Sequence, residues 1–223
     1  MTSIVSGLSR AQIATLSSSI VSRLIRTDVA EMSTTQVSAL RCQQLRSWPA
    51  SDIGALTAPQ IAAISYTSFL ALTEAQTAAL STTQIHALNS SQISSLSDAD
   101  LNQMTTTQIQ SLSLDQVHAL STTQLGSLTA TTLSRFYTSK IGALLQTQEQ
   151  ALTSTQLNGL SSADVGALNV SNLTETQIGG LSTAVTSFTT TQVRALNTTQ
   201  IGALSTEALS WLSTAQIQAL SSD

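Results

Sequence analysis

An eight-residue period runs through almost the whole chain and limits what it can fold into. The phrase occurs twice in succession between Leu80 and Ser95, as L-S-T-T-Q-I-H-A and L-N-S-S-Q-I-S-S. Counted from the leucine, position 1 is large and apolar, position 2 is usually Ser or Thr, and position 5 is usually Gln. Position 6 is Ile, Val or Leu in most octads, and position 8 is usually Ala or another small residue. Self-similarity at a fixed period indicates a repeat architecture.

Each octad carries a helix start signal. Ser81 at position 2 is a good cap residue, and Gln84, three residues later, can bond back to the N–H of that cap, which makes a capping box. Leu80 and Ile85 have the spacing of a hydrophobic staple across the cap. Each octad therefore predicts one helix of about six residues, roughly 9 Å long at 1.5 Å per residue. Such a helix is too short to be stable alone and must pack against neighbouring octads.

Two other arrangements compete with this one. A single long helix fits poorly, because eight residues advance about 80° beyond two full turns and the leucines would spiral around the helix. A β-solenoid suits the Ser/Thr-rich, weakly charged composition and the alternation of Ile85 and Ala87, but Leu88 breaks that alternation and Ala and Gln favour helix. We predict an all-α solenoid of very short helices, one per eight-residue repeat, with a β-solenoid as the alternative. The number of octads per turn stays open.

The octad frame holds without insertion or deletion from Leu8 to Ala167. All twenty residues at position 1 in this run are large and apolar, so positions 1 and 6, with the small residue at position 8, are predicted to line the core. Glu149 is a charged exception at position 6, and we expect Leu145 to take over its apolar role with a local distortion. We predict one repeat array over residues 1–223, with a frame break at residues 168–187 where half an octad is missing.

Composition narrows the class of protein. Charged residues make up 9% of the 223 residues and aromatic residues 3%, while hydrophobic residues reach 41% and the net charge is −4. A disordered chain would have more charge and fewer aliphatic side chains. The chain has no apolar run of membrane-spanning length and no basic cluster, so we expect neither membrane insertion nor a nucleic-acid partner.

Asp replaces Gln at position 5 in four octads. These residues are Asp28, Asp52, Asp100 and Asp164. A carboxylate near a helix N-terminus serves as a cap and interacts favourably with the exposed amides. The functional alternative is calcium, but calcium needs six to eight oxygen ligands and these carboxylates are isolated in sequence. We therefore interpret the four residues as caps.

The remaining candidates for chemistry are few. His86 and His118 both occupy position 7, four octads apart, and make a weak metal pair at best. The sequence has no G-x-S-x-G motif and no phosphate-binding glycine loop. We predict that the protein is not an enzyme, with no catalytic, cofactor-binding or metal-ligating residues and no cofactors.

The placement of aromatic residues that depart from the consensus would distinguish a stalk from an interaction scaffold. We expect Trp48, at position 1, to lie in the core and Trp211, at position 8, to cover the C-terminal end of the array. A stalk predicts a surface without a cluster of unusual residues. An interaction scaffold predicts that Tyr66, Phe69, Tyr137 and Trp211 converge on one patch.

The octads Leu80–Ala87, Leu120–Ser127 and Leu196–Ala203 resemble octapeptide arrays, of the form L-[ST]-x-x-Q-[IV]-x-A, in very large bacterial surface proteins of adhesin-like or RTX-like type. The resemblance covers essentially the whole chain and brings no functional residues with it. It implies an extracellular or cell-surface location and, as the first hypothesis, a non-catalytic spacer or stalk. The second hypothesis is a scaffold that binds a protein or glycan through one solenoid face. Self-association at the open solenoid ends is a further expectation.

Overall fold

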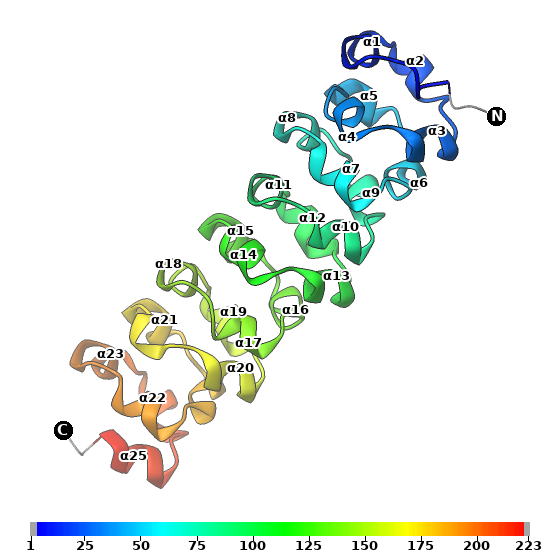
Figure 1. The fold of residues 1–223 in the computed structure, drawn as a ribbon. Helices are drawn as coiled ribbons and strands as arrows, with labels where there is room; N and C mark the ends of the chain where they lie inside the picture. The colour runs from blue at the N-terminus through cyan, green and yellow to red at the C-terminus, as the bar shows by residue number, and fades with distance from the viewer. Residues whose placement is uncertain (1–3, 221–223) are drawn as a thin grey trace. The chain divides into compact units, whose positions relative to one another are not determined.

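Residues 4–220 are described by a computed structural model, in which every regular element is a helix (Figure 1). This part of the chain contains twenty-five α-helices and two 3-10 helices, and it contains no strand. The α-helices are four to seven residues long, close to the six expected for one octad. The prediction of an all-α solenoid of very short helices is confirmed, and the alternative of a β-solenoid is wrong.

The chain forms two compact units, Met1–Ala119 and Leu120–Asp223. The division lies inside the regular run of octads, well before the frame break at residues 168–187. A single array over residues 1–223 stays a prediction, and its residues 1–3 and 221–223 lie outside the described part of the chain.

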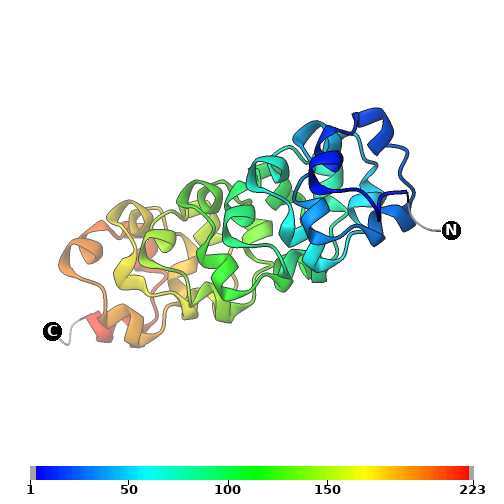
Figure 2. The same cartoon turned by 45° about the horizontal axis from the view of Figure 1, so that its top comes forward.

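The first unit has fourteen described α-helices, one per octad. They are α1 (Arg10–Thr15), α2 (Ser18–Val21), α3 (Arg26–Glu31), α4 (Thr34–Val37), α5 (Cys42–Arg46), α6 (Ala50–Ile53), α7 (Ala58–Ala63), α8 (Tyr66–Phe69), α9 (Glu74–Ala78), α10 (Thr82–His86), α11 (Ser90–Ser95), α12 (Asp98–Gln103), α13 (Thr106–Ser111) and α14 (Leu114–His118). Helices three octads apart are neighbours: α4, α7, α10 and α13 form one series of contacts, and α5, α8 and α11 form another (Figures 1 and 2). One coil of the solenoid therefore takes three octads, or 24 residues.

The second unit continues the same pattern and contains the frame break. Its elements are α15 (Thr122–Ser127), α16 (Ala130–Leu133), α17 (Thr138–Ile141), α18 (Gln146–Glu149), α19 (Ser154–Asn158), α20 (Ser162–Ala167), η1 (Val170–Asn172), α21 (Glu175–Gly179), η2 (Thr183–Ser187), α22 (Thr190–Arg194), α23 (Thr198–Ala203), α24 (Thr206–Ser210) and α25 (Thr214–Leu220). The helices before the break contact each other three octads apart, as α15 does with α18 and α17 with α20. The two shortened pieces of sequence form the 3-10 helices η1 and η2. In the five-residue piece that contains η1, too few residues remain for a full α-helical turn and its cap.

The cap at position 2 shows why each helix starts where it does. Ser81 has an extended backbone (φ −69°, ψ 160°), and its Oγ accepts a hydrogen bond from the N–H of Gln84 at 3.3 Å. The Gln84 Oε1 in return accepts from the N–H of Ser81 at 2.8 Å. These two bonds are the reciprocal pair of a capping box. Leu145 has no side-chain acceptor, so only one bond of the pair remains there, from the N–H of Leu145 to the Oε1 of Gln148 at 3.1 Å.

Burial follows positions 1, 5 and 6 of the octad. Position 6 is fully buried in most octads, and seventeen of the twenty residues at position 1 between Leu8 and Leu160 are buried. The three exceptions, Leu8, Leu16 and Leu72, are only half-buried. The prediction that position 8 lines the core is wrong, because residues such as Ala55 and Ala87 are half-buried. The polar Gln at position 5 takes that place in the interior.

Several glycines at positions 7 and 8 lie where neighbouring coils approach closely. Every described residue, including each glycine, has a negative φ, so no glycine is needed here for a left-handed backbone. A Cβ on Gly180 would lie 2.6 Å from the Cβ of Ser154 in α19, which is closer than real Cβ atoms approach. A Cβ on Gly166, inside α20, would meet nothing within 4 Å. The missing side chain of Gly180 is therefore a packing requirement, whereas that of Gly166 is not.

This contrast predicts opposite effects of the same substitution. Gly180→Ala should destabilise the second unit by about 1–3 kcal/mol, the usual range for overpacking. Gly166→Ala should stabilise it by about 0.4–1 kcal/mol, because alanine restricts the unfolded chain and fits the helix. Urea denaturation of the two variants, followed by circular dichroism at 222 nm, compares them directly. Equal midpoints would contradict the coil spacing described here.

Candidate functional site

The side-chain amide of Gln84 joins two coils. Its Nε2 donates hydrogen bonds to the carbonyl oxygens of Ile53 at 3.0 Å and Leu56 at 2.6 Å, while its Oε1 accepts from the N–H of Ser81. The two carbonyls belong to the end of α6 and the residue before the cap of α7. They are among the carbonyls that a helix end leaves unpaired. One amide therefore satisfies the start of its own helix and the end of a helix in the preceding coil.

The same arrangement recurs along the array, and we call it the glutamine ladder. It includes twelve glutamines that each donate to two such carbonyls, namely Gln36, Gln44, Gln60, Gln76, Gln84, Gln92, Gln116, Gln156, Gln177, Gln192, Gln200 and Gln216. Gln108 makes a similar pair of bonds to Ala78 and Leu80. In the regular octads the two carbonyls lie 31 and 28 residues earlier in the chain. All twelve side chains are buried, so an unpaired amide or carbonyl at this place would be costly.

The ladder continues through the frame break. Gln177 bonds the carbonyl oxygens of Glu149 and Leu152, which lie 28 and 25 residues earlier. Both separations are three residues shorter than in a regular octad, because the piece from Leu168 to Asn172 has five residues in place of eight. The structural positions of the two carbonyls, at octad positions 6 and 1, are unchanged. The missing residues thus shorten a helix without breaking the link between coils.

Aspartate at position 5 cannot make this link, because a carboxylate has no N–H to donate. Asp164 instead accepts from the Oγ1 of Thr138 at 2.6 Å. In the octad of Asp52, the Nε1 of Trp48 takes over the carbonyl of Val21 at 2.8 Å. This position also explains the burial of Trp48, which was predicted as a core residue.

The cap interpretation fits these carboxylates unequally. The Oδ2 of Asp28 accepts from the N–H of Ile25 at 3.2 Å, and the Oδ2 of Asp100 accepts from the N–H of Ser97 at 3.0 Å. Asp52 has no such bond to accept, because its cap residue is Pro49, which lacks an N–H.

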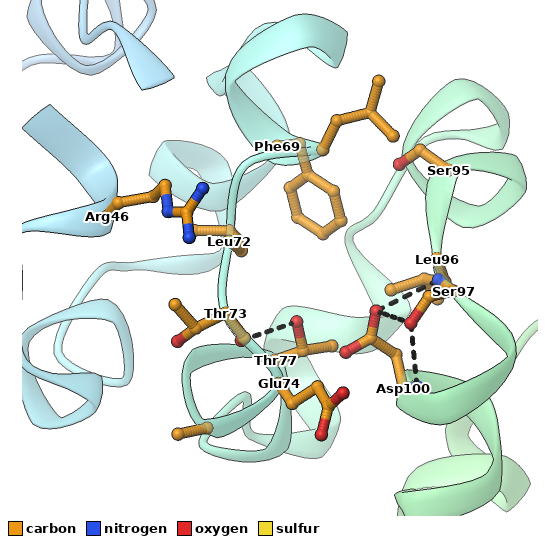
Figure 3. A pocket seen from close by; sticks show the side chains of 12 residues that line it. Arg46, Phe69, Leu72, Thr73, Glu74, Thr77, Ser95, Leu96, Ser97 and Asp100 are labelled. Atoms are coloured by element: carbon orange, nitrogen blue, oxygen red, sulfur yellow. Dashed lines mark hydrogen bonds between the residues drawn. The ribbon is translucent and has the colours of Figure 1, made fainter. Parts of the chain in front are cut away.

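Two clefts in the first unit lie where position 5 is not glutamine. One, of about 580 Å³, is lined by Asp100, and the other, of about 860 Å³, is lined by Ser68. Ser68 keeps a single bond to the earlier coil, from its Oγ to the carbonyl of Leu40 at 2.7 Å. In the first cleft, Figure 3 shows Arg46, Phe69 and Asp100 around the same space. The clefts therefore mark places where the side chain at position 5 is too short to fill the gap between coils.

Glu149 is buried at position 6 and accepts hydrogen bonds from residues of the shortened piece at the frame break. Only 1% of the residue is exposed. Its Oε1 accepts from the backbone N–H of Asn169 at 2.9 Å, and its Oε2 accepts from the Nδ2 of Asn172 at 2.6 Å. Burial raises the pKa of the Glu149 carboxyl, although the hydrogen bonds from Asn172 and Asn169 partly oppose that shift. The expectation that Leu145 takes over the apolar role is wrong, because Leu145 is 46% exposed.

The other residues singled out in the sequence are not brought together. His86 lies in α10, where its Nδ1 is 3.0 Å from the carbonyl oxygen of Ser111. His118 lies in α14, which belongs to the series of α11 and not to that of α10. Within the described residues, no three His, Cys, Asp or Glu side chains are grouped so that they could hold a metal ion. Phe69 is buried in α8, so it cannot share an exposed patch with Tyr66, Tyr137 and Trp211.

Sequence comparison agrees with the repeat architecture. Residues 98–130 and 185–222 match the model of the ALTTAQ repeat. Together the two stretches cover less than half of the chain. A search of curated protein sequences finds no match. The chain is a repeat-containing protein with similarity to the ALTTAQ repeat, which confirms the predicted repeat array in this coarser form.

In residues 4–220, none of the helices combines the length and the apolar content needed to cross a bilayer.

The ladder predicts a large effect of a nearly isosteric change at one glutamine. Gln84→Glu keeps an acceptor for the Ser81 N–H but turns a carboxylate oxygen toward the carbonyls of Ile53 and Leu56. An uncompensated buried charge costs about 3–5 kcal/mol, so the free energy of unfolding should fall by that amount at pH 7. Thr83→Glu places the same charge on the exposed side of α10 and should change stability by less than about 0.5 kcal/mol. Similar denaturation midpoints for the two variants would refute the inter-coil role of Gln84.

Glu149 predicts a pH dependence of stability. Because its pKa is higher in the folded chain than the ordinary value of 4.5, the folded state binds the proton more tightly than the unfolded state does. The free energy of unfolding should therefore decrease as the pH rises from about 4.5 through the raised folded pKa. Glu149→Gln removes this contribution, so the wild-type and variant midpoints should diverge as the pH is raised. Denaturation curves measured from pH 4 to pH 8 test this, and parallel curves for the two proteins would contradict it.

Proposed function

We propose that this chain is a non-catalytic structural segment, a spacer or stalk, of a bacterial surface or secreted protein. The observation that carries the proposal is the glutamine ladder. The glutamine that recurs at position 5 of most octads is used to bond one coil to the preceding one, and it is buried there. A spacer must provide length, so we expect its recurring polar side chains to bond one coil to another.

The contacts within each unit support a modular role. In the first unit, neighbouring helices in each series are three octads apart, so a coil interacts with the coils next to it. In such an array stability is close to a sum of repeat and interface terms, and coils can be added or removed without redesign of the rest. The frame break shows the same tolerance, because the ladder continues across a shortened repeat.

Small, uncharged residues are common on the exposed face of the octad. Positions 3 and 4 carry small hydroxyl residues in many octads, and pairs such as Thr82 and Thr83 or Thr122 and Thr123 are exposed. A neutral, hydrated surface of this kind suits a segment that must remain soluble without binding its surroundings. We extend the proposal to an extracellular or cell-surface location on the basis of the octad resemblance, and to the absence of enzymatic activity.

A second candidate function is an interaction scaffold that binds a protein or glycan. The observation in its favour is that clefts of the first unit are lined by departures from the consensus, Ser68 and Asp100. Against a single aromatic binding patch stands the burial of Phe69. A spacer requires the number of coils, whereas a scaffold requires particular exposed side chains.

Removal of one coil tests whether the length of the segment follows the number of its coils, as a spacer requires. Spin labels at cysteines that replace the exposed Thr35 and Thr107, in a Cys42→Ser background, would report the distance along the series from α4 to α13. Deletion of residues 80–103 removes exactly three octads and should shorten this distance by about 8–10 Å, the usual spacing of packed helices. The helical circular-dichroism signal per residue should not change. An unchanged distance or loss of the helical signal would contradict the spacer.

The control is the double substitution Thr82→Ala and Thr83→Ala, which changes the exposed hydroxyls and keeps every coil. The distance should then stay the same. Antibody labelling of intact cells that produce the protein tests its location separately, with labelling before lysis expected for a surface protein and labelling only after lysis contradicting it.

A further inference from the structure

Asp100 occupies the place of a ladder glutamine, and the carbonyls that such a glutamine would bond are present. They are the carbonyls of Phe69 and Leu72, which lie 31 and 28 residues earlier, as in the regular octads. The Phe69 carbonyl accepts only the local bond from the N–H of Leu72, at 3.0 Å. Among the described residues no donor reaches the carbonyl oxygen of Leu72. Leu72 is also half-buried, unlike most residues at position 1.

The carboxylate of Asp100 adds a further unpaired acceptor. Its Oδ2 accepts from the N–H and the Oγ of Ser97, at 3.0 and 2.6 Å. Its Oδ1 is buried and has no hydrogen-bond partner among the described residues. Asp164, in contrast, receives a bond from Thr138. The octad of Asp100 therefore has one carboxylate oxygen without a partner, on the side chain that replaces the glutamine expected to bond an earlier helix end.

These oxygens belong to residues that line a cleft of about 580 Å³ (Figure 3). Its apolar wall is formed by Phe69, Leu70 and Leu96, and Leu70 is 51% exposed. Glu74 contributes a second carboxylate, whose Oε2 accepts from the Nε2 of Gln103 at 2.9 Å. The volume lies within the range of small-ligand sites.

The group that complements such a cleft must donate hydrogen bonds and carry positive charge. The ammonium group has three N–H donors, no acceptor, and a compact charge, so it can replace the amide NH₂ of the missing glutamine and also neutralise the carboxylate. An attached alkyl chain would lie on the apolar wall, where the Phe69 ring attracts a nearby cation. We propose that the cleft at Asp100 binds a primary ammonium group, carried by a free alkylamine or by a lysine side chain of a partner protein.

The test is a titration of the full chain with n-butylammonium chloride. Binding is monitored through the backbone amide signals in ¹H–¹⁵N correlation spectra. Residues around the cleft, such as Thr73, Thr77 and Ser97, should show saturable shifts. Asp100→Gln supplies the missing amide within the chain and should weaken butylammonium binding at least tenfold while raising the melting temperature. Asp98→Gln removes the same charge from an exposed position on the same helix and should bind like the wild type.

Several results would overturn the proposal. One is that sodium chloride at equal ionic strength, or n-butanol, produces the same shifts, and another is that butylammonium binding persists in Asp100→Gln. A lower melting temperature for Asp100→Gln would show that the carbonyls are not placed as inferred. Arg46 also lines the cleft, so Arg46→Gln is included. Binding should be kept in that variant, and its loss would show that the amine does not bind to the acceptors named here.

A second ligand distinguishes the two possible sources of the ammonium group, a free amine and a lysine side chain. Nα-acetyl-lysine methylamide presents a lysine side chain without a free α-amino group. Binding as strong as that of butylammonium supports a lysine of a partner protein. Binding of butylammonium alone supports a free amine. Both results support the ammonium site, and neither depends on whether the array serves as a spacer.

Discussion

Pairing of backbone polar groups is the constraint on which this structure depends. An α-helix leaves its first four N–H groups and its last four carbonyls without intrahelical partners. In helices of four to seven residues, almost every peptide group is therefore at an end. The array packs these ends against each other, where water cannot pair them. A side chain that both donates and accepts, and that is long enough to reach the preceding coil, can pair both kinds of group, and the glutamine at position 5 of most octads meets these conditions.

The exceptions show how strongly this constraint acts. Where Asp52 replaces glutamine, the indole of Trp48 donates to the Val21 carbonyl, which otherwise accepts only the local bond from the N–H of Leu24. Where Asp164 replaces it, Thr138 turns its hydroxyl to the carboxylate. Glu149, a charged residue at an apolar position, is buried only together with two donors from the shortened repeat that follows. The Oδ1 of Asp100 has no comparable donor among the described residues, and a cleft lies beside it.

The local structure could be predicted from the sequence because its causes lie within one octad. The cap at Ser81 and the bond from its N–H to Gln84 depend on neighbours fewer than five residues away, and the burial of Ile85 follows from the apolar residue that recurs at position 6. The second role of Gln84 could not be predicted, because its partners lie 28 and 31 residues earlier and the number of octads per coil is set by packing. The partnership of Glu149 with Asn172 was missed for the same reason, since a shortened repeat and a misplaced charge appear as separate irregularities until the coils are stacked. The residues that replace glutamine at position 5 were visible in the sequence. Their effect on the packing of the coils could not be predicted, because it depends on which backbone carbonyls of the preceding coil lose a donor.

The most direct test of the glutamine ladder is hydrogen exchange of the glutamine side-chain amides, measured by nuclear magnetic resonance. In the folded chain the Nε2 protons of Gln84 and Gln92 should exchange slowly, because they are buried and bonded to backbone carbonyls. Gln12, which is exposed at the same octad position, provides the reference and should exchange at the rate of a free amide. Slow exchange of the buried glutamines, with rapid exchange at Gln12, is the result expected if the ladder joins the coils. Equally rapid exchange at all three would show that the coils are held together without it.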